Sequence, residues 1–292
     1  MNGILLVDKP SGWTSNDVVQ KLRGALRERR IGHAGTLDPM ATGLLTVFVG
    51  RATRAVEFAE SDGKTYIAGL RLGVVTDTQD TTGTILRTEP VSEITPERLE
   101  HVLQSFHGVI RQIPPMYSAV RVNGKRLYDL ARRGETVERV PREIRIDELK
   151  VLDGEGADWT LFVRCSKGTY IRTLCHDIGS LLGCGACMSS LRRTAAGIFQ
   201  VSDAVALEDA VRLASEGKAE ELLIPTDRLF AQYGELVLGE PDEKRLRNGT
   251  PVEGSFLTAF IGFTRRIGNF LPLHDAPGES CAASKVFLRF KI

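Results

Sequence analysis

The chain has 292 residues, of which 42% are hydrophobic and 26% charged, a composition typical of folded globular proteins rather than of disordered or fibrous ones. It contains 38 lysines and arginines against 37 aspartates and glutamates, which excludes a broadly basic nucleic-acid binder of the histone kind. No apolar run approaches the roughly 20 residues of a membrane helix, and the first residues lack the pattern of a secretory signal. Because five cysteines do not make a disulfide framework in a chain of this length, we expect a cytoplasmic protein.

The first predicted elements are a strand, a helix and a second strand. Gly3–Val7 is a short apolar strand, and Thr14 then offers an N-cap hydroxyl to a helix whose apolar residues recur at helical spacing. A glycine-rich loop, Gly32–Gly43, follows this helix. It leads into the continuous apolar strand Leu44–Val49.

Three further strands are predicted in the middle of the chain. Thr65–Leu72 alternates so that Tyr66, Leu70 and Leu72 share one face. Ile144–Leu152 and Trp159–Cys165 also have strand patterns and are joined by a predicted loop over residues 153–156.

Helices are predicted between these strands. Thr95-Pro96-Glu97 combines a cap, a proline at the first position and early negative charge, which together mark a helix start. Asn123-Gly124 permits the positive backbone angles of a tight turn, and a short helix over Arg126–Arg133 follows and stops at Gly134.

The order of these elements indicates the fold class. Strands and helices are interspersed without strict alternation, which predicts an α+β protein with a mixed, largely antiparallel sheet flanked by helices. After Pro225 a new set of short strand-like pieces begins. We therefore predict a main domain over residues 1–228 and a small β-rich C-terminal unit over residues 229–292.

Two stretches concentrate positive charge in this nearly neutral chain. Arg111–Arg145 holds nine basic and four acidic residues, and Arg164–Arg193 holds five basic residues against one aspartate. Such stretches form either a local phosphate-binding face or an ordinary solvated surface, and charge alone does not decide between them.

The sequence does not match the known metal-binding and nucleotide-binding motifs with which it can be compared. Gly63-Lys64-Thr65 resembles the end of a phosphate loop, but Phe58 stands where that motif needs glycine. Asp77 to Asp80 lacks the ligand spacing of a calcium loop, and Cys184 and Cys187 form a lone pair that is more typical of buried thiols than of zinc ligands. We therefore expect no metal and no cofactor.

The loop Gly32–Gly43 carries the strongest functional signal. Asp38 precedes Pro39, which pushes its backbone toward an extended conformation, and the glycines of the loop permit close approach by a large partner. In isolation an Asp-Pro pair is commonly just a turn, and His33 by itself is commonly a structural histidine.

The whole string decides between these interpretations. Gly32-His33-Ala-Gly35-Thr-Leu-Asp38-Pro39-Met-Ala-Thr-Gly43-Leu-Leu resembles the catalytic-loop motif of the bacterial tRNA pseudouridine-55 synthase family, tRNA pseudouridine synthase B. The resemblance spans roughly residues 1 to 200. Companion motifs of that family appear in order: Asp8-Lys-Pro-Ser-Gly-Trp-Thr-Ser15, Gly63-Lys-Thr-Tyr66, Thr76-Asp-Thr-Gln-Asp80, Pro114-Pro-Met-Tyr-Ser-Ala119, Ser166-Lys-Gly-Thr-Tyr170-Ile-Arg172-Thr and Leu191-Arg-Arg-Thr194.

The resemblance implies the pseudouridine synthase fold and an isomerase that acts on one uridine of folded tRNA without a cofactor. A carboxylate suits the cleavage of a glycosidic bond because it can stabilise or trap a sugar cation. Asp38 matches the family's catalytic aspartate, and Arg172 matches the arginine that pairs with it. Whether Asp38 attacks the sugar, attacks the base or removes a proton stays open at this point.

The resemblance also implies a pocket for a flipped nucleotide. Tyr66 is the expected stacking ring, although the leucines on its strand face fit core packing equally well. Tyr170 and Leu191 are expected to complete the pocket walls, and His33 to occupy the space that the flipped nucleotide leaves. Because Tyr170 and Arg172 share a side only in extended chain, we expect them at a strand end, with a helix from about Thr173.

The implied partner is the T-arm and T-loop of tRNA, with the two basic stretches as phosphate contacts. The start of the chain directly at the first strand favours a stand-alone monomeric enzyme without a protein partner. Family members commonly end in a PUA-type RNA-binding domain, which residues 246–252 faintly resemble and from which the sequence departs beyond Phe256. The alternatives are a tRNA-folding module without chemistry, an aspartyl-nucleophile hydrolase, and a related synthase acting on another RNA.

Overall fold

The computed structural model describes residues 1–231 and 241, apart from residues 61–62, 92–93 and 123. Within these residues ten strands form one large sheet. Its main path contains, in spatial order, β14 (Val205–Ala206), β1 (Gly3–Lys9), β3 (Thr42–Val49), β12 (Ala186–Ala196), β4 (Lys64–Leu72), β11 (Asp158–Cys165), β10 (Arg142–Glu155) and β7 (Gly108–Gln112), while β2 (Ile31–Ala34) pairs with β3 and β13 (Phe199–Gln200) with β12.

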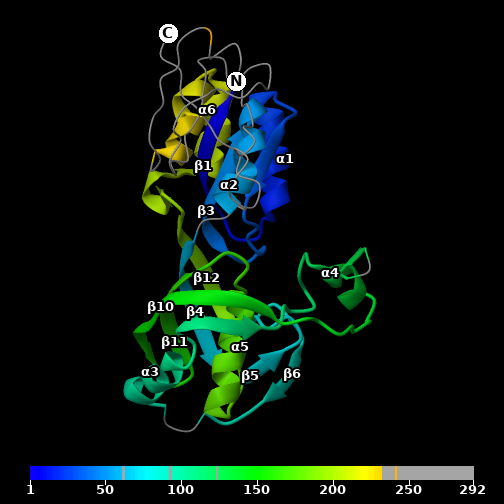
Figure 1. The fold of residues 1–292 in the computed structure, drawn as a ribbon, viewed down its shortest axis with the longest axis vertical. Coiled ribbons are helices and arrows are strands. Elements are labelled where there is room, and N and C mark those ends of the chain that lie inside the picture. The colour runs from blue at the N-terminus through cyan, green and yellow to red at the C-terminus, as the bar shows by residue number, and fades with distance from the viewer. Residues whose placement is uncertain (61–62, 92–93, 123, 232–240, 242–292) are drawn as a thin grey trace.

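Neighbouring strands run antiparallel except at two places, where β14 lies beside β1 and β3 beside β12. The predicted α+β class, with a mixed and largely antiparallel sheet flanked by helices, is confirmed (Figure 1).

The remaining described elements are helices and two small hairpins. The hairpins pair β5 (Val74–Thr76) with β6 (Ile85–Thr88) and β8 (Arg121–Val122) with β9 (Lys125–Arg126). The α-helices are α1 (Ser15–Leu26), α2 (Val56–Glu60), α3 (Pro96–Gln104), α4 (Leu127–Ala131), α5 (Ile171–Leu182) and α6 (Leu207–Ser215). The 3-10 helices are η1 (Gly50–Ala55), η2 (Val201–Asp203), η3 (Ala219–Leu222) and η4 (Thr226–Phe230).

Local sequence explains the start of α1. Thr14 and Asp17 form a capping box, in which the Asp17 amide donates to the Thr14 hydroxyl at 3.0 Å and the Thr14 amide donates to the Asp17 carboxylate at 2.9 Å. The apolar residues at helical spacing are buried, as the sequence predicts.

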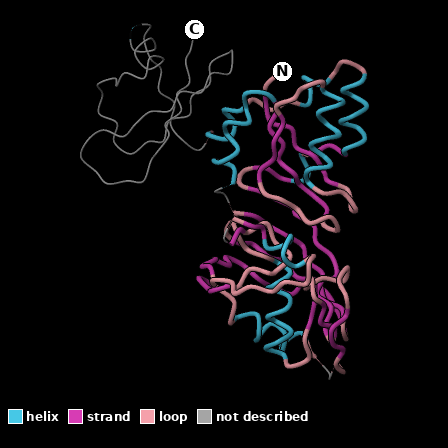
Figure 2. Tube along the Cα trace, turned by 90° about the vertical axis from the view of Figure 1, so that its right-hand side faces the viewer, coloured by secondary structure: helices cyan, strands magenta, loops and turns pink. Residues whose placement is uncertain are grey.

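The sheet consists of two halves that lie end to end in Figures 1 and 2. The first half-sheet, made of β14, β1, β3 and β2, is covered on both faces, because alternate residues of β1 enter two separate apolar clusters. One cluster contains residues of α1 and α6, and the other contains residues of η1, α2 and η4. The second half-sheet, made of β12, β4, β11, β10 and β7, packs against α3 and α5.

The two half-sheets meet where β3 lies beside β12. The parallel strand pairing of β3 with β12 includes only two residue pairs, Thr42 with Arg192 and Gly43 with Arg193. Gly43 has φ +98°, and a Cβ at this position would lie 2.3 Å from the carbonyl oxygen of Arg193. Glycine is therefore required for the two strands to approach this closely.

Element boundaries differ from the predictions at three places. The predicted loop Gly32–Gly43 is shorter, because β2 takes up its first residues and β3 begins at Thr42. Strand β10 continues through Glu155 into the predicted loop, with Gly154 at φ +142°. The third difference concerns the start of α5 and is described with the site below.

The C-terminal prediction falls largely on residues that the structure does not describe. The short helix η4 spans the predicted boundary at residue 228, and its Leu229 and Phe230 pack in an apolar cluster of the first half-sheet. The predicted β-rich unit over residues 229–292 otherwise lies outside the described residues, apart from residues 229–231 and 241, and the domain division stays a prediction.

Two helical glycines give opposite predictions for the same substitution. Gly24 of α1 has no atom within 4 Å of an added Cβ, whereas a Cβ on Gly179 of α5 would lie 2.2 Å from the backbone nitrogen of Ala186. We expect Gly24→Ala to raise the free energy of unfolding by about 0.5–1 kcal/mol, since alanine restricts the unfolded chain and favours helix. Gly179→Ala should lower it by about 1–3 kcal/mol through overpacking of α5 on β12.

Urea unfolding of the two variants beside the wild-type chain measures both effects. Equal effects of the same sign would contradict this packing of α5.

Candidate active site

Asp38 lies in the short connection between β2 and β3, which the preceding segment holds in place. The Ser15 hydroxyl accepts from the Leu37 amide at 2.9 Å and donates to the Leu37 carbonyl at 3.3 Å. The Pro39 carbonyl accepts from the Gly12 amide at 2.8 Å. Asp38 is therefore presented from a backbone that is bonded on both sides of it.

Lys9, at the end of β1, adds a charged contact to the same loop. Its side chain is fully buried, and Nζ donates to the carbonyl oxygens of Trp13 at 2.6 Å, Pro10 at 2.8 Å and Pro39 at 3.2 Å. Burial lowers the pKa of Lys9 from 10.5 to about 8, an effect that the negative charge of Asp38 opposes.

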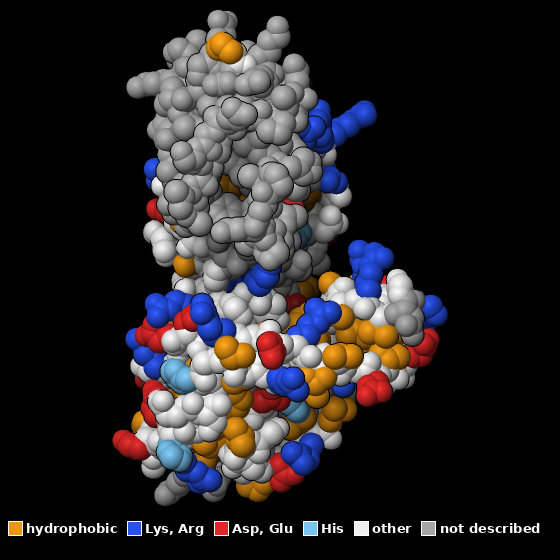
Figure 3. Space-filling model, in the orientation of Figure 1, with side chains coloured by type: hydrophobic (Ala, Val, Ile, Leu, Met, Phe, Trp, Pro, Cys, Tyr) orange, Lys and Arg blue, Asp and Glu red, His pale blue; other side chains and the backbone are white. Residues whose placement is uncertain are grey.

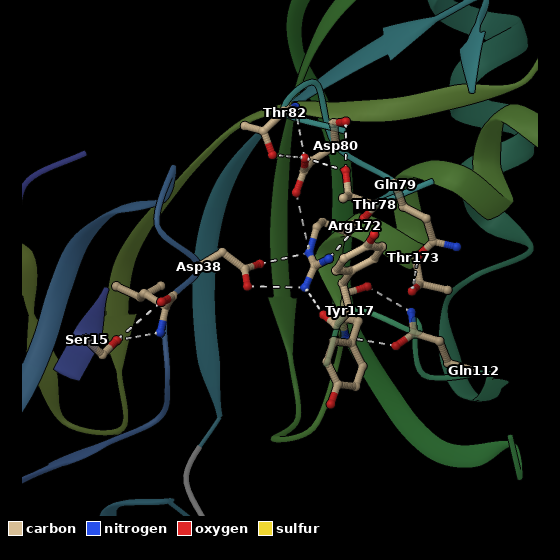
Figure 4. A network of polar contacts seen from close by, with 12 residues as sticks. Ser15, Asp38, Thr78, Gln79, Asp80, Thr82, Gln112, Tyr117, Arg172 and Thr173 are labelled. Atoms are coloured by element: carbon tan, nitrogen blue, oxygen red, sulfur yellow. Dashed lines mark hydrogen bonds and ion pairs between the residues drawn. The ribbon is translucent and has the colours of Figure 1, made fainter. Parts of the chain in front are cut away.

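Arg172 approaches Asp38 from α5, on the other half-sheet. Its Nε lies 2.9 Å from Asp38 Oδ2 and its Nη2 lies 3.2 Å from Asp38 Oδ1, so the pair is bidentate (Figure 4). The Arg172 side chain is 6% exposed, whereas that of Asp38 is 35% exposed. The carboxylate thus reaches solvent while its cationic partner is held inside the protein.

Backbone carbonyls accept from two further N–H groups of this guanidinium. Nη1 of Arg172 donates to the Thr78 carbonyl at 2.9 Å, and Nη2 donates to the Tyr117 carbonyl at 2.8 Å. These carbonyls belong to the Thr76–Asp80 and Pro114–Ala119 motifs, which are distant from each other in the sequence. Arg172 therefore joins three separate segments around one planar group.

Asp80 is a site residue to which the sequence analysis assigned no role. Its Oδ2 lies 3.8 Å from Arg172 Nε, and its side chain is 6% exposed. Its Oδ1 accepts from the Thr78 hydroxyl at 2.8 Å and from the Thr82 amide at 2.9 Å. Its place in a companion motif was the available signal, but nothing in the spacing showed that Asp80 approaches the Arg172 guanidinium from a different side than Asp38 (Figure 4).

The position of Tyr170 and Arg172 at a strand end is wrong. Helix α5 begins at Ile171, with Tyr170 as an extended N-cap residue at φ −96° and ψ 105°. The side chain of Gln112, on β7, accepts from the Tyr170 amide at 2.8 Å and donates to the Tyr170 carbonyl at 3.0 Å. The Gln112 side-chain amide thus bonds the Tyr170 backbone as a neighbouring strand would. The helix begins at Ile171, two residues earlier than predicted.

The structure places Tyr66 and Leu191 behind the loop. Both belong to the apolar cluster that includes Leu37 and Ala41, with 6% and 8% of their surfaces exposed. Burial raises the pKa of the Tyr66 hydroxyl. The core-packing interpretation of Tyr66 is correct for this structure, and its role in stacking stays a prediction.

His33 lies on β2, and Asp38 follows in the connection from β2 to β3. Its Nδ1 is buried and has no hydrogen-bond partner among the described residues, and burial lowers the pKa of its ring. No hydrogen bond or ion pair between described residues links His33 to Asp38 or Arg172. Within the described residues, His33 is therefore not part of the hydrogen-bonded network around the ion pair.

The two basic stretches differ in what they expose. Within Arg164–Arg193, Arg172 and Arg193 are buried and Arg192 pairs with Asp8 at 2.7 Å. Arg172 and Arg193 are therefore withdrawn from any phosphate-binding face, whereas Arg164, Lys167 and Arg192 stay at least partly exposed. The Arg111–Arg145 stretch includes a projecting hairpin that is considered under the proposed function.

Among the described residues, no group of three or more His, Cys, Asp or Glu side chains is arranged to hold a metal ion. Cys184 and Cys187 are both buried free thiols. None of the helices in the described part of the chain is long and apolar enough to cross a membrane.

Comparison with known proteins shows which family the chain resembles. A family model described as TruB family pseudouridylate synthase (N terminal domain) matches residues 23–171, and one described as tRNA pseudouridylate synthase B C-terminal domain matches residues 172–231. The proteins named tRNA pseudouridine synthase B from Syntrophotalea carbinolica and Clostridium kluyveri are 45% and 44% identical to this chain. These alignments cover 90% and 89% of the chain, and 86% and 89% of the relatives.

Two solved structures share the fold. The crystal structure of a Cbf5-Nop10-Gar1 complex matches with a TM-score of 0.67 and 29% identity over 85% of this chain and 67% of that chain. The structure of an H/ACA RNP bound to a substrate RNA containing 2′-deoxyuridine matches with a TM-score of 0.65 and 27% identity over 86% of this chain and 67% of that chain.

The fold, with an aspartate–arginine pair at the centre of its sheet, is that of a pseudouridine synthase. More closely, the chain belongs to the TruB family of pseudouridylate synthases. The family resemblance of the sequence is confirmed, and the chain is an isomerase rather than a hydrolase.

Replacing Asp80 tests the second carboxylate beside Arg172. Asp80→Asn keeps the shape but presents an amide to the guanidinium, which should displace Arg172 and with it Asp38. We expect kcat to fall by about 10-fold to 100-fold, or ~1–3 kcal/mol, with a much smaller change in RNA affinity. Single-turnover kinetics beside a filter-binding assay measures the two quantities.

Asp158→Asn is the matched control, because Asp158 forms an exposed ion pair with Arg71 on the second half-sheet. An Asp80→Asn enzyme as fast as this control would contradict the role of Asp80.

The lowered pKa of Lys9 predicts a pH-dependent contribution to stability. The unfolded chain keeps Lys9 protonated up to its ordinary pKa of 10.5, whereas the folded chain releases the proton near pH 8. Between these values the unfolded state binds more protons, so the Lys9 contribution to folding becomes more favourable as the pH rises. In urea unfolding, the unfolding free energy of the wild-type chain minus that of Lys9→Met should therefore become more positive from pH 7.5 to pH 9.5. A constant difference would show that Lys9 has an ordinary pKa.

Proposed function

We propose that this enzyme converts a uridine in the T-loop of tRNA to pseudouridine, with Asp38 as the catalytic carboxylate. The observation that carries the proposal is the bidentate Asp38–Arg172 pair, in which a solvent-reaching carboxylate is oriented by a buried guanidinium. Relatives of 45% and 44% identity, named tRNA pseudouridine synthase B, support tRNA as the substrate.

The reaction is an isomerisation that needs no group from outside. The N1–C1′ bond of the uridine breaks, the detached base turns over, and C5 bonds to C1′. C5 loses a proton and N1 gains one, so atoms and electrons balance without an oxidant or a reductant. We propose that Asp38 attacks the sugar at C1′, attacks the base or accepts a proton during this sequence, while Arg172 orients the carboxylate.

A uridine within a stacked RNA arm must first leave the stack, which costs a few kcal/mol. We propose that the flipped base enters beside Tyr66 and Leu191, with Tyr170 at the start of α5 as the third wall. Because only 6% of Tyr66 is exposed, stacking requires the residues that cover its ring to shift. His33 is proposed to lie on the RNA side of the loop and to occupy the space that the nucleotide leaves.

A basic projection supports RNA as the partner. The hairpin β8–β9 and helix α4 extend from the body of the protein, and Figure 3 shows Lys and Arg side chains on this projection. A hollow of about 620 Å³ there is lined by Arg121, Gly124, Lys125, Arg126, Asp129 and Arg133. Four cations against one carboxylate suit the phosphates of an RNA arm, and binding through them weakens as salt is added.

We further propose that the enzyme works as a monomer in the cytoplasm on the T-arm, without a protein partner. The alternative is a related synthase guided to another RNA, since the titles of the two solved relatives describe a complex with Nop10 and Gar1 and an RNP. The higher identity to the bacterial relatives named for tRNA favours the stand-alone enzyme. A tRNA-folding activity is compatible with both, because base flipping already disrupts loop contacts.

The decisive experiment uses the full chain, unmodified tRNA and no added cofactor. Sequencing of the product should map one pseudouridine to the T-loop. Asp38→Asn should lower the rate by at least ~1,000-fold while tRNA affinity stays within about threefold, because it removes a charge and little shape.

Asp209→Asn is the control, since Asp209 pairs with Arg212 on the exposed face of α6. Failure of the folded wild-type protein to convert any T-loop uridine in bound tRNA would refute the proposed substrate. An Asp38→Asn enzyme that keeps full activity would refute the proposed catalyst.

A further inference from the structure

Arg193, on β12, is a buried charge that the proposed reaction does not use. None of its surface is exposed, and no ion pair between described residues includes it. Its Nη1 is buried without a hydrogen-bond partner among the described residues. An unpaired buried cation is costly to folding, so its retention at this place needs a reason.

The two other nitrogens of the guanidinium bond the ends of the Asp38 loop. Nη2 donates to the Gly35 carbonyl at 3.0 Å, directly after β2, and Nε donates to the Leu44 carbonyl at 2.7 Å, near the start of β3. One planar group thus ties together the residues at which the loop leaves the first half-sheet and returns to it.

Arg193 also stands at the junction of the two half-sheets. It pairs with Gly43 of β3 on one side and with Tyr66 of β4 on the other. Asp38 comes from the first half-sheet, whereas Arg172 lies on α5, which packs on β12 in the second. The guanidinium of Arg193 is therefore placed to set where the carboxylate of one half meets the arginine of the other.

The neighbouring titratable groups do not offer another explanation. The charge of Arg193 acts on Lys9, His33 and Tyr66, none of which is an anion at neutral pH. Arg193 interacts with the Tyr66 hydroxyl and donates hydrogen bonds to the two backbone carbonyls. Its geometry, rather than pairing with a carboxylate, therefore accounts for its position.

We propose that Arg193 is a positioning residue that holds together Gly35 and Leu44, the two ends of the Asp38 loop, and so aligns Asp38 with Arg172. This inference rests on the proposed function for its kinetic consequence, while the hold on the loop is independent of any activity. The residue acts through Asp38 and does not contact the substrate.

Arg193→Lys tests the proposal, because lysine keeps the charge but its single ammonium does not reproduce the fork that reaches both carbonyls. We expect kcat for tRNA to fall by about 10-fold to 100-fold with KM within about threefold. Hydrogen exchange of the amides in residues 35–41 should accelerate at least ~10-fold, while β4 and β11 keep their wild-type protection.

Arg23→Lys is the matched control. Arg23, on α1, donates to the Ile31 carbonyl at 2.8 Å and also has a buried, unpaired Nε, but it does not bond the Asp38 loop. This variant should lose some stability and keep the wild-type kcat and the loop exchange rate. Accelerated exchange across the whole sheet of Arg193→Lys, or unchanged kcat in the folded variant, would overturn the proposal.

If Arg193→Lys does not fold, Gly35→Ala decides the question. Gly35 has φ +71°, and an added Cβ would lie 3.1 Å from Arg193 Nη1. This change therefore disturbs the contact between Arg193 and the Asp38 loop and keeps the buried charge. It should give the same fall in kcat and the same local exchange, and wild-type values of both would overturn the proposal. If the wild-type enzyme makes no pseudouridine, the proposed function fails, and loop exchange alone still decides whether Arg193 holds the loop.

Discussion

The orientation of the Asp38 carboxylate depends on the Arg172 guanidinium, which the surrounding backbone holds in place. Arg172 is 6% exposed and bonds two backbone carbonyls, so its two donors toward Asp38 point in one direction only. The Asp38 carboxylate, 35% exposed, is oriented by a partner that is held inside the protein. Because Asp80 faces the same guanidinium from another side, the cluster holds two carboxylates around one cation. Arg172 therefore has a second anionic neighbour besides Asp38.

The architecture explains how such an ion pair is built from distant segments. The loop of Asp38 leaves the first half-sheet, and Arg172 is on a helix of the second, while the strand pairing of β3 with β12 includes only two residue pairs. A narrow junction allows an open site at the middle of the sheet, but it also makes the alignment of the halves critical. Lys9 and Ser15 hold the loop from one side, and Arg193 crosses the junction from the other.

Most of the fold was predictable where local signals and tertiary packing agree. Helix α1 has its cap and its apolar stripe in the sequence, and the alternation of β4 matches its buried face. The start of α5 was not predictable, because the Gln112 amide that holds Tyr170 lies 58 residues away in the sequence. The loop of Asp38 was also predicted too long, since β2 forms only by pairing with β3.

The sequence by itself determined the family, the pairing of Asp38 with Arg172 and the absence of known cofactor motifs, because ordered motifs carry that information without coordinates. Tertiary structure alone decided that Asp80 faces Arg172, that Tyr66 is covered in the core and that Arg172 and Arg193 of the second basic stretch are buried. Net charge per segment does not say which way a side chain points, and a buried cation such as Arg193 looks in sequence like any surface arginine. Burial and direction arise only when strands distant in the chain come together.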